Sequence, residues 1–160
     1  TWTIQLSGDT TDVELVYTAG APANDFSTWI DGFYPSETDP AIIGFDADPD
    51  GDGVSNGEEA FFGTDPSATS SGLTSGTKSG STYTVTHPNP SSGSEVTGLT
   101  VSYEWSLDLT NWNASGATVG GSTVTIASES DTPSANVTTV TATITDTEPN
   151  ELFLRVNITN

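Results

Sequence analysis

Acidic side chains recur at every second position in one short, glycine-rich stretch of the sequence, residues 48–59. Three aspartates stand at positions 1, 3 and 5 of this stretch, and Gly53 follows at position 6. This spacing is the pattern of a twelve-residue calcium loop, in which alternate residues point inward because the backbone turns sharply at the glycine. The predicted calcium ligands are Asp48, Asp50, Asp52, Val54 (through its main-chain carbonyl), Asn56 and Glu59.

The charges of this loop explain why it needs a cation. Asp48, Asp50, Asp52 and Glu59 crowd four carboxylates into one pocket, and like charges at short range repel one another. We therefore expect Ca²⁺ to order the loop. An acidic, glycine-rich surface turn is the alternative interpretation, but it does not explain why every ligand position is filled at once.

The residues around the loop resemble a known repeat. Asp-Pro-Asp-Gly-Asp-Gly-Val-Ser-Asn-Gly-Glu-Glu, followed by Gly63-Thr64-Asp65-Pro66, is similar to the thrombospondin type 3-like calcium repeats of secreted bacterial proteins and, more distantly, to the dockerin loop. The resemblance spans residues 46–66 and implies a structural calcium site to which Asp46 and Asp65 add further ligands. Only one repeat is present, and its flanking helices are too short for a calcium sensor that opens a groove.

Composition excludes several classes of partner and of chemistry. The 160 residues include 22 Asp and Glu but only 2 Lys and Arg, which gives a formal net charge of −20. Such a charge repels nucleic acid and anionic membrane surfaces, and no apolar run is long enough for membrane insertion. The absence of cysteine excludes disulfides, thiol catalysis and thiolate metal sites. High acidity suits both solubility in saline water and the collection of divalent cations.

Calcium also predicts where the protein works. Weak extracellular calcium modules bind at about 10⁻⁴ to 10⁻³ M, a concentration found outside the cell and not in a cytosol. The chain begins at Thr1 without an initiator methionine, as a processed product would. We therefore expect a secreted protein at the cell surface.

The front half of the chain shows signals for strands and short helices around the loop. Two alternating runs, 2–7 and 13–17, predict a hairpin with its turn at 8–10. After a small-residue linker at 19–24, apolar residues at helical spacing predict a helix that follows an Asn24/Asp25 cap and stops before Pro35. A second helix is expected over 55–62, ended by Gly63. The aromatic residues expected to cover the first helix are Phe45, Phe61 and Phe62.

The second half predicts a β-sandwich. Residues 67–80 are rich in serine and glycine and indicate a flexible linker with at most a short strand near Leu73. Apolar residues then alternate with polar ones in the runs 83–87, 99–105, 124–126, 140–144 and 152–158. The expected fold is mainly β: N-terminal strands and short helices around an EF-hand-like calcium loop in 1–66, the linker, and an immunoglobulin-like or jelly-roll sandwich in 81–160. Residues 101–112 and 152–156 resemble the C-terminal β-modules of secreted bacterial proteins.

The sequence carries few residues for catalysis. His87 is the only histidine, no Gly-x-Ser-x-Gly motif is present, and His87 is predicted to lie in a solvated strand end. We therefore do not expect an enzyme. Three aromatic residues of the second half can form a flat platform for sugars, although strand tryptophans are more often core residues. These candidate glycan-binding residues are Tyr103, Trp105 and Trp112.

Two functions follow from these observations. The first is a secreted, calcium-stabilised structural protein, a subunit of an extracellular filament or surface matrix that self-associates by strand addition through its alternating terminal strands. The alternative is a carbohydrate-binding or adhesion module that recognises glycans or other surface proteins. Pairing of a terminal strand within its own domain is the alternative to strand addition, and deep burial of both Trp105 and Trp112 would exclude the glycan-binding module.

Overall fold

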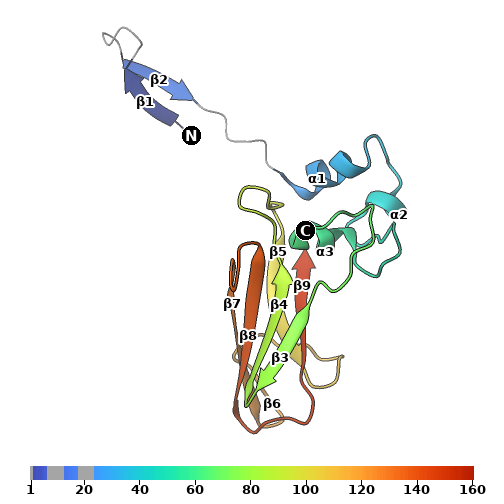
Figure 1. Ribbon diagram of the computed structural model, residues 1–160, viewed down its shortest axis with the longest axis vertical. Coiled ribbons are helices and arrows are strands. Elements are labelled where there is room, and N and C mark those ends of the chain that lie inside the picture. Colours follow the sequence, from blue (N-terminus) through green and yellow to red (C-terminus); the bar gives the residue numbers. More distant parts are fainter. Residues whose placement is uncertain (1, 7–12, 18–23) are drawn as a thin grey trace.

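The fold is mainly β with antiparallel sheets, in a computed structural model that describes residues 2–6, 13–17 and 24–160 (Figure 1). One sheet has five strands in the order β3-β4-β8-β7-β6, a second pairs β5 with β9, and a third pairs β1 with β2. The strands are β1 (Trp2–Leu6), β2 (Val13–Tyr17), β3 (Ser75–Ser79), β4 (Thr82–Pro88), β5 (Thr100–Ser106), β6 (Thr118–Val119), β7 (Ser122–Glu129), β8 (Val137–Asp146) and β9 (Phe153–Thr159).

The predicted strands of both halves are present where the alternation of apolar residues places them. The N-terminal hairpin forms with Ile4 opposite Leu15, while its predicted turn at 8–10 and most of the linker at 19–24 lie outside the described residues. In β8 every second side chain is buried, at Thr138, Val140 and alternate positions beyond. This period-two burial is the reason that sequence alternation predicts strands.

The five-stranded and two-stranded sheets share one core. Trp105 of β5 is fully buried in a cluster with Val124 of β7 and with Ala142 and Ile144 of β8, and Leu154 of β9 packs against it. Both sheets therefore contribute side chains to one hydrophobic cluster. Removing a buried tryptophan of this kind typically costs about 3–5 kcal/mol of stability, so Trp105 is a main anchor of the β region.

Three short helices precede the sheets, and local signals define their ends. Helix α1 (Phe26–Phe33) begins after Asp25, whose carboxylate accepts the Thr28 N–H at 2.8 Å. Helix α3 (Asn56–Phe62) begins with a capping box between Ser55 and Glu58. It ends at Gly63, whose φ of 76° lies in the left-handed region that favours glycine. These two helices confirm the sequence prediction, whereas the single-turn helix α2 (Pro40–Ile43) is an addition to it.

The helices enclose a second, smaller core. Phe26 and Ile30 of α1 and Ala60 of α3 are buried together, and Phe45 meets Phe26 edge-on with ring centroids 5.0 Å apart. The predicted role of Phe45 is therefore confirmed.

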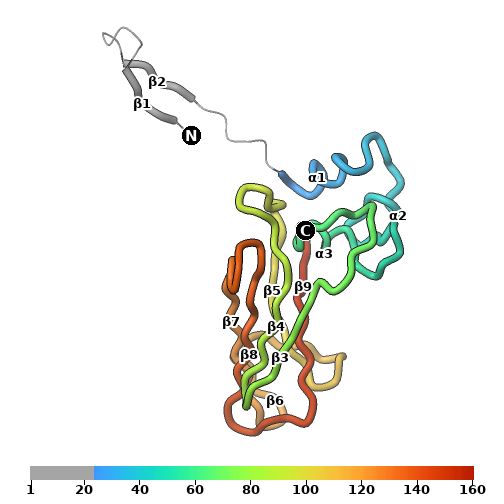
Figure 2. Tube along the Cα trace, viewed as in Figure 1, coloured from blue at the N-terminus to red at the C-terminus, as the bar shows by residue number. Residues whose placement is uncertain are grey.

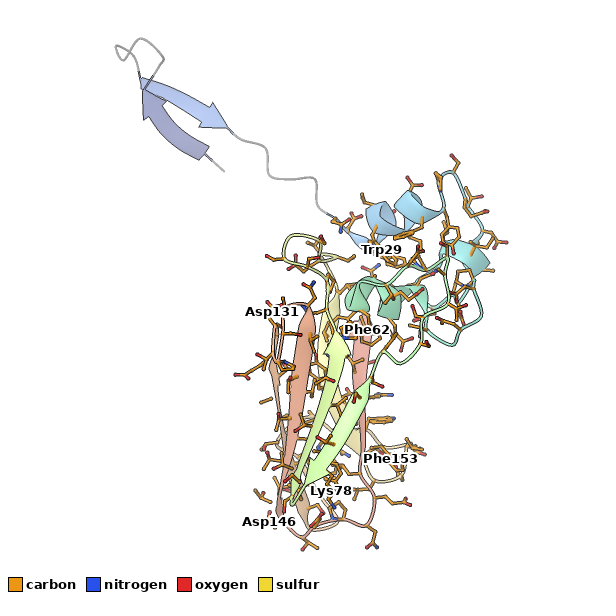
Figure 3. All side chains as sticks on the ribbon, in the orientation of Figure 1. Trp29, Phe62, Lys78, Asp131, Asp146 and Phe153 are labelled. Atoms are coloured by element: carbon orange, nitrogen blue, oxygen red, sulfur yellow. The ribbon has the colours of Figure 1, made fainter. Side chains whose placement is uncertain are left out.

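Phe61 and Phe62 were expected in the same cluster, and this prediction is wrong. Their rings lie 5.2 and 5.5 Å from the imidazole of His87 on β4. Successive helical residues are rotated by about 100°, so α3 presents Ala60 to α1 and the two phenylalanines to the strands. Figure 3 shows Phe62 between α3 and the sheets.

His87 is buried, and the prediction of a solvated histidine is also wrong. Only 5% of its surface is exposed, and its Nε2 atom lies 2.8 Å from the hydroxyl of Tyr103. Phe61 and Phe62 cover the ring. Burial lowers the pKa of His87 below its usual value of 6.5, so the neutral imidazole is favoured.

The helical part and the sheets are joined by direct contacts. Val96, from the loop between β4 and β5, belongs to the helical core, and the Thr97 N–H donates to the Asn24 carbonyl at 2.9 Å. Strand β3 lies inside the predicted linker 67–80 and pairs along its whole length with β4. All five of its residues are exposed, so the sequence of β3 lacks the apolar alternation that predicts a strand. Figure 2 follows this direct passage from α3 into the five-stranded sheet.

Within the described residues, no helix is both long and apolar enough to cross a membrane.

Candidate metal centre

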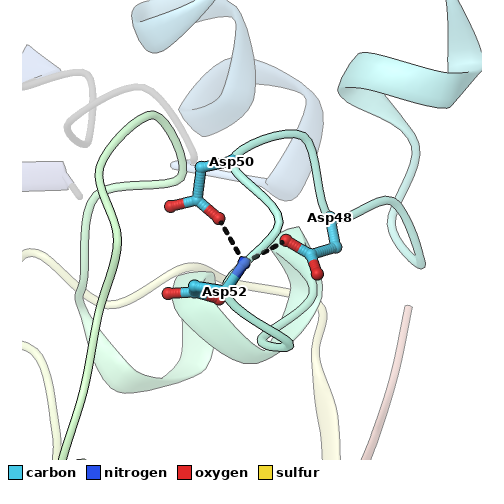
Figure 4. Close-up of side chains that lie close together, drawn as sticks. All are labelled: Asp48, Asp50 and Asp52. Carbon is cyan, nitrogen blue, oxygen red and sulfur yellow. Dashed lines mark hydrogen bonds between the residues drawn. The ribbon is translucent and has the colours of Figure 1, made fainter.

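The loop before α3 curls around its own aspartates. The Asp48 carboxylate accepts the N–H groups of Gly51 at 2.9 Å, Asp52 at 3.2 Å and Gly53 at 2.9 Å. Gly53 has a φ of 89°, so the sharp turn predicted at position 6 is present. The Asp50 carboxylate also accepts the Asp52 N–H, at 3.1 Å (Figure 4). The loop backbone thus holds the three side chains in fixed directions.

These three carboxylates converge. One oxygen atom each of Asp48, Asp50 and Asp52 can be chosen so that all lie within 4.8 Å of one another. Three negative charges at this separation repel strongly, and a cation between them removes that penalty. The predicted grouping of the three aspartates is therefore present in the structure.

Three buried oxygen atoms of the predicted ligands have no hydrogen-bond partner among the residues that the structure describes. They are Oδ2 of Asp50, Oδ1 of Asn56 and Oε2 of Glu59, which belong to loop positions 3, 9 and 12. Buried polar atoms in folded proteins are almost always paired, because an unpaired one costs about 1–3 kcal/mol. Each of these oxygens therefore calls for a partner that the described part of the chain does not supply.

Helix α3 brings Asn56 and Glu59 to the loop, and both residues have no exposed surface. The Asn56 amide donates from Nδ2 to the carbonyls of Ile42 and Gly44, both at 2.8 Å. This orientation commits the NH₂ group to the backbone and leaves Oδ1 as the free acceptor. The start of α3 is therefore tied to the segment before the loop.

Burial and charge set the protonation of the site. Burial, with the nearby charges of Asp50 and Asp52, raises the pKa of Glu59 to about 7. Burial likewise raises the pKa of Asp50. The pKa of Asp48 is lowered instead, mainly because the Gly53 N–H donates to its carboxylate. Without a cation, the anionic forms of Asp50 and Glu59 are therefore disfavoured. A bound cation would favour these anionic forms instead.

Two residues that are not among the predicted ligands, Thr64 and Ser70, also contact the site. The Ser70 N–H donates to Oδ2 of Asp52, and its hydroxyl lies 3.4 Å from Oε1 of Glu59. The Thr64 hydroxyl donates to the same Glu59 oxygen at 3.2 Å. Thr64 follows the loop closely enough to be suspected, but Ser70 lies in a serine-rich stretch that carries no motif. Ser70 links the segment before β3 to the carboxylate cluster.

The additional ligands suggested by the resemblance are not part of this cluster. Oδ1 of Asp65 accepts the N–H and hydroxyl of Ser67 at 2.9 and 2.6 Å, which fixes Asp65 in a local turn. Asp46 is exposed and stands outside the converging aspartates. Val54 donates its N–H to Asp52 Oδ1 at 2.7 Å, so position 7 is held against position 5.

The three candidate glycan-binding aromatics do not form one platform. Trp105 is fully buried and its Nε1–H donates to the Ala114 carbonyl at 3.1 Å, so the sequence prediction is wrong for this residue. Tyr103 is engaged with His87. The Trp112 ring is partly exposed, but the Arg155 guanidinium lies 4.2 Å from its centroid and covers one face.

The donor set fits a hard cation. The predicted ligands offer carboxylate, amide and main-chain oxygens, and no histidine or cysteine is among them. In comparisons with known proteins, the chain matches no protein-family model, no curated protein and no solved structure. The function proposed below therefore rests on the loop and its contacts.

Proposed function

We propose that this chain is a calcium-stabilised structural protein. Three buried oxygens without partners, all at predicted ligand positions, carry this proposal. Asp48, Asp50, Asp52, the Val54 carbonyl, Asn56 and Glu59 would hold the ion. A calcium ion supplies no reaction here. It neutralises the carboxylates and gives the unpaired oxygens a partner.

Calcium suits this donor set better than magnesium. Ca²⁺ takes six to eight oxygens, including several carboxylates and a main-chain carbonyl, in flexible geometry. Mg²⁺ retains several waters and is usually held by only one or two carboxylates. The three converging aspartates, with the buried carboxylate of Glu59 as a fourth predicted ligand, therefore favour calcium.

The ion would brace the junction between helices and sheets. Its ligands come from the loop and from α3, which also supplies Ala60 to the helical core and Phe62 to the face against β4. Ser70 connects the same carboxylates to the segment that enters β3. A metal at this point would hold the angle between the two parts, which is a property that a structural subunit requires.

The proposed setting is outside the cell, in a filament or surface matrix built by self-association. An ion available at about 10⁻⁴ to 10⁻³ M outside cells supports this setting. Two facing sheets that share the Trp105 cluster support the assignment of residues 75–160 to an immunoglobulin-like or jelly-roll sandwich. Carbohydrate binding receives less support, because Trp105 is buried and Trp112 is partly covered.

Calcium titration by calorimetry tests the proposal. We expect one strong site in the native chain, which Asp50→Asn weakens at least about tenfold because the variant removes one converging charge. Asp31→Asn removes the same charge from an exposed position of α1 and should leave binding unchanged. A hundredfold excess of calcium over Kd should stabilise the fold by about 2.7 kcal/mol. Absence of binding at millimolar calcium, or equal effects of the two variants, would overturn the proposal.

A further inference from the structure

An apolar groove opens between the two sheets on one side of the molecule, where β3 borders β9. Its volume is about 350 Å³. Apolar side chains from four elements line it: Phe62 of α3, Val85 of β4, Val140 of β8, and Leu154 and Val156 of β9. In a closed sandwich such side chains would be covered by another strand.

Both strands that border this β3–β9 groove have a free edge. Strand β3 pairs only with β4, and β9 pairs only with β5. Among the described residues, no main-chain hydrogen bond outside these pairings involves residues 75–79 or 153–159. A free edge beside an apolar groove is the arrangement that accepts an added strand, since the backbone supplies hydrogen bonds and the groove takes alternate side chains.

The two strands that border the β3–β9 groove carry the basic residues of this acidic chain. The chain has only two Lys and Arg residues, and they lie on the two bordering strands: Lys78 on β3 and Arg155 on β9. Figure 3 shows Lys78 on β3. Their partners are Glu148 and Glu104. Elsewhere the strongly acidic chain repels an acidic segment, so the groove is the least unfavourable place for one to dock.

The N-terminal hairpin, β1 and β2, has the properties expected of a strand that could be added at this edge. Its register pairs apolar with apolar residues, Trp2 with Tyr17 and Ile4 with Leu15. Residues 1–23 carry three acidic residues and no Lys or Arg. Among the described residues, β1 and β2 pair only with each other, and an isolated two-stranded hairpin is marginally stable in water.

We propose that the β3–β9 groove receives the N-terminal hairpin of a second copy of the chain, which extends the β5–β9 sheet along the free edge of β9. The contact is head-to-tail: each copy offers one hairpin and one groove, so repetition makes a linear polymer. This inference rests on the proposed role as an assembling structural protein, and it names the surface and the segment that assemble.

Single charges placed in the full chain test the contact. Val156→Glu puts a carboxylate in the groove, and Ile4→Glu puts one in the hairpin. Each should convert polymers to monomers in sedimentation velocity and mass photometry, because a buried unpaired charge is costly. The matched control is Val119→Glu, which adds the same charge at an exposed position of β6, at the other edge of the five-stranded sheet. It should assemble as the native chain does.

Mixing the two monomeric variants gives the decisive result. Ile4→Glu keeps an intact groove and Val156→Glu keeps an intact hairpin, so their mixture can form one contact and no more. We expect dimers in the mixture and monomers in each variant alone. A native chain that stays monomeric, variants that polymerise normally, or a mixture that stays monomeric would each overturn the proposal. The first of these results would also follow if the hairpin of each chain bound the groove of the same chain.

Melting curves show whether each variant is folded. If Val156→Glu does not fold, Gly76→Glu replaces it, because Gly76 borders the groove and an added Cβ meets no atom closer than 3.6 Å. Calcium titration of the same samples separates this inference from the metal site. Normal calcium binding without assembly overturns the groove contact alone, and groove-dependent assembly without calcium binding overturns the calcium site alone.

Discussion

The Glu59 carboxylate should be charged to bind the proposed metal ion, but neutral to stabilise the metal-free fold. This carboxylate has no exposed surface, and burial raises its pKa to about 7. The charged form therefore destabilises the calcium-free protein, yet the same charge would be a ligand of the proposed calcium ion. Glu59→Gln keeps the side-chain shape and removes the charge. We expect the variant to melt at a higher temperature than the native chain in chelator, and at a lower one in calcium.

Scanning calorimetry in chelator and in calcium measures the difference in melting temperature between Glu59→Gln and the native chain. This difference should be positive in chelator and negative in calcium. Glu58→Gln is the control, because the neighbouring Glu58 caps α3 through Ser55 and glutamine also serves in a capping box. Its melting temperature should follow the native value in both conditions. Destabilisation of Glu59→Gln by the same amount with and without calcium would show that Glu59 has only a packing role.

His87 makes the stability of the fold sensitive to mild acid. Burial lowers its pKa below 6.5 in the folded state, so the unfolded chain binds a proton more readily near that pH. The stability gained from the neutral ring is complete above about pH 6.5, the unfolded value, and is lost as the pH falls from there toward the folded pKa. The titration of one group changes the free energy of unfolding by at most about 1.4 kcal/mol per pH unit.

The test of His87 compares two pH profiles. Urea unfolding of the native chain and of His87→Gln, in saturating calcium between about pH 7.5 and pH 5, gives the free energy of each. We expect the variant to be less stable at neutral pH, because packing against Phe61 and Phe62 is lost, but to show a shallower decline in acid. Parallel profiles would mean that His87 does not titrate in this range.

Helix α3 is the element that joins the site to both cores, and its fit depends on a glycine. A Cβ built at Gly57 would lie 2.4 Å from the Phe45 ring, and the Gly57 N–H donates to the Phe45 carbonyl at 2.8 Å. Gly57→Ala should therefore push α3 away from the segment before the loop. Overpacking of this kind costs about 1–3 kcal/mol, and calcium affinity should fall as well because Asn56 and Glu59 move with the helix.

Gly32→Ala is the matched control for this element. Gly32 lies in α1, where an added Cβ meets nothing within 4 Å, so alanine should be neutral or stabilise by up to about 1 kcal/mol through helix propensity. Urea unfolding of both variants and calcium titration give the comparison. If Gly57→Ala binds calcium with native affinity, the close contact with Phe45 does not position the ligands.

At the scale of the whole molecule, a net charge of −20 opposes folding and assembly. Salt screens such repulsion, with a screening length of about 10 Å at 0.1 M. We expect added sodium chloride to raise the melting temperature strongly in chelator and more weakly in calcium, where the loop carboxylates are already neutralised. Thermal scans from low to high ionic strength in both solutions measure the two slopes. Equal slopes would show that the repulsion relieved by calcium is not part of the stability balance.

Features that depend only on neighbouring residues could be predicted from the sequence. The spacing of Asp48, Asp50 and Asp52, the turn at Gly53 and the caps of α1 and α3 are local patterns, so they were predictable. The strands β4, β5, β7, β8 and β9 were predictable too, because apolar residues alternate with polar ones along each of them. Strand β3 was missed because every residue in it is exposed.

Contacts between residues far apart in the chain became known only from the folded arrangement. Ser70 at the carboxylates, Val96 in the helical core and Phe61 against His87 are contacts between segments far apart in the chain, and no local period encodes them. The complete burial of Glu59, and with it the unpaired oxygen that supports the calcium proposal, is likewise a product of packing. Spacing names the candidate ligands, but the desolvation that makes a cation necessary arises only when the helices and strands close around them.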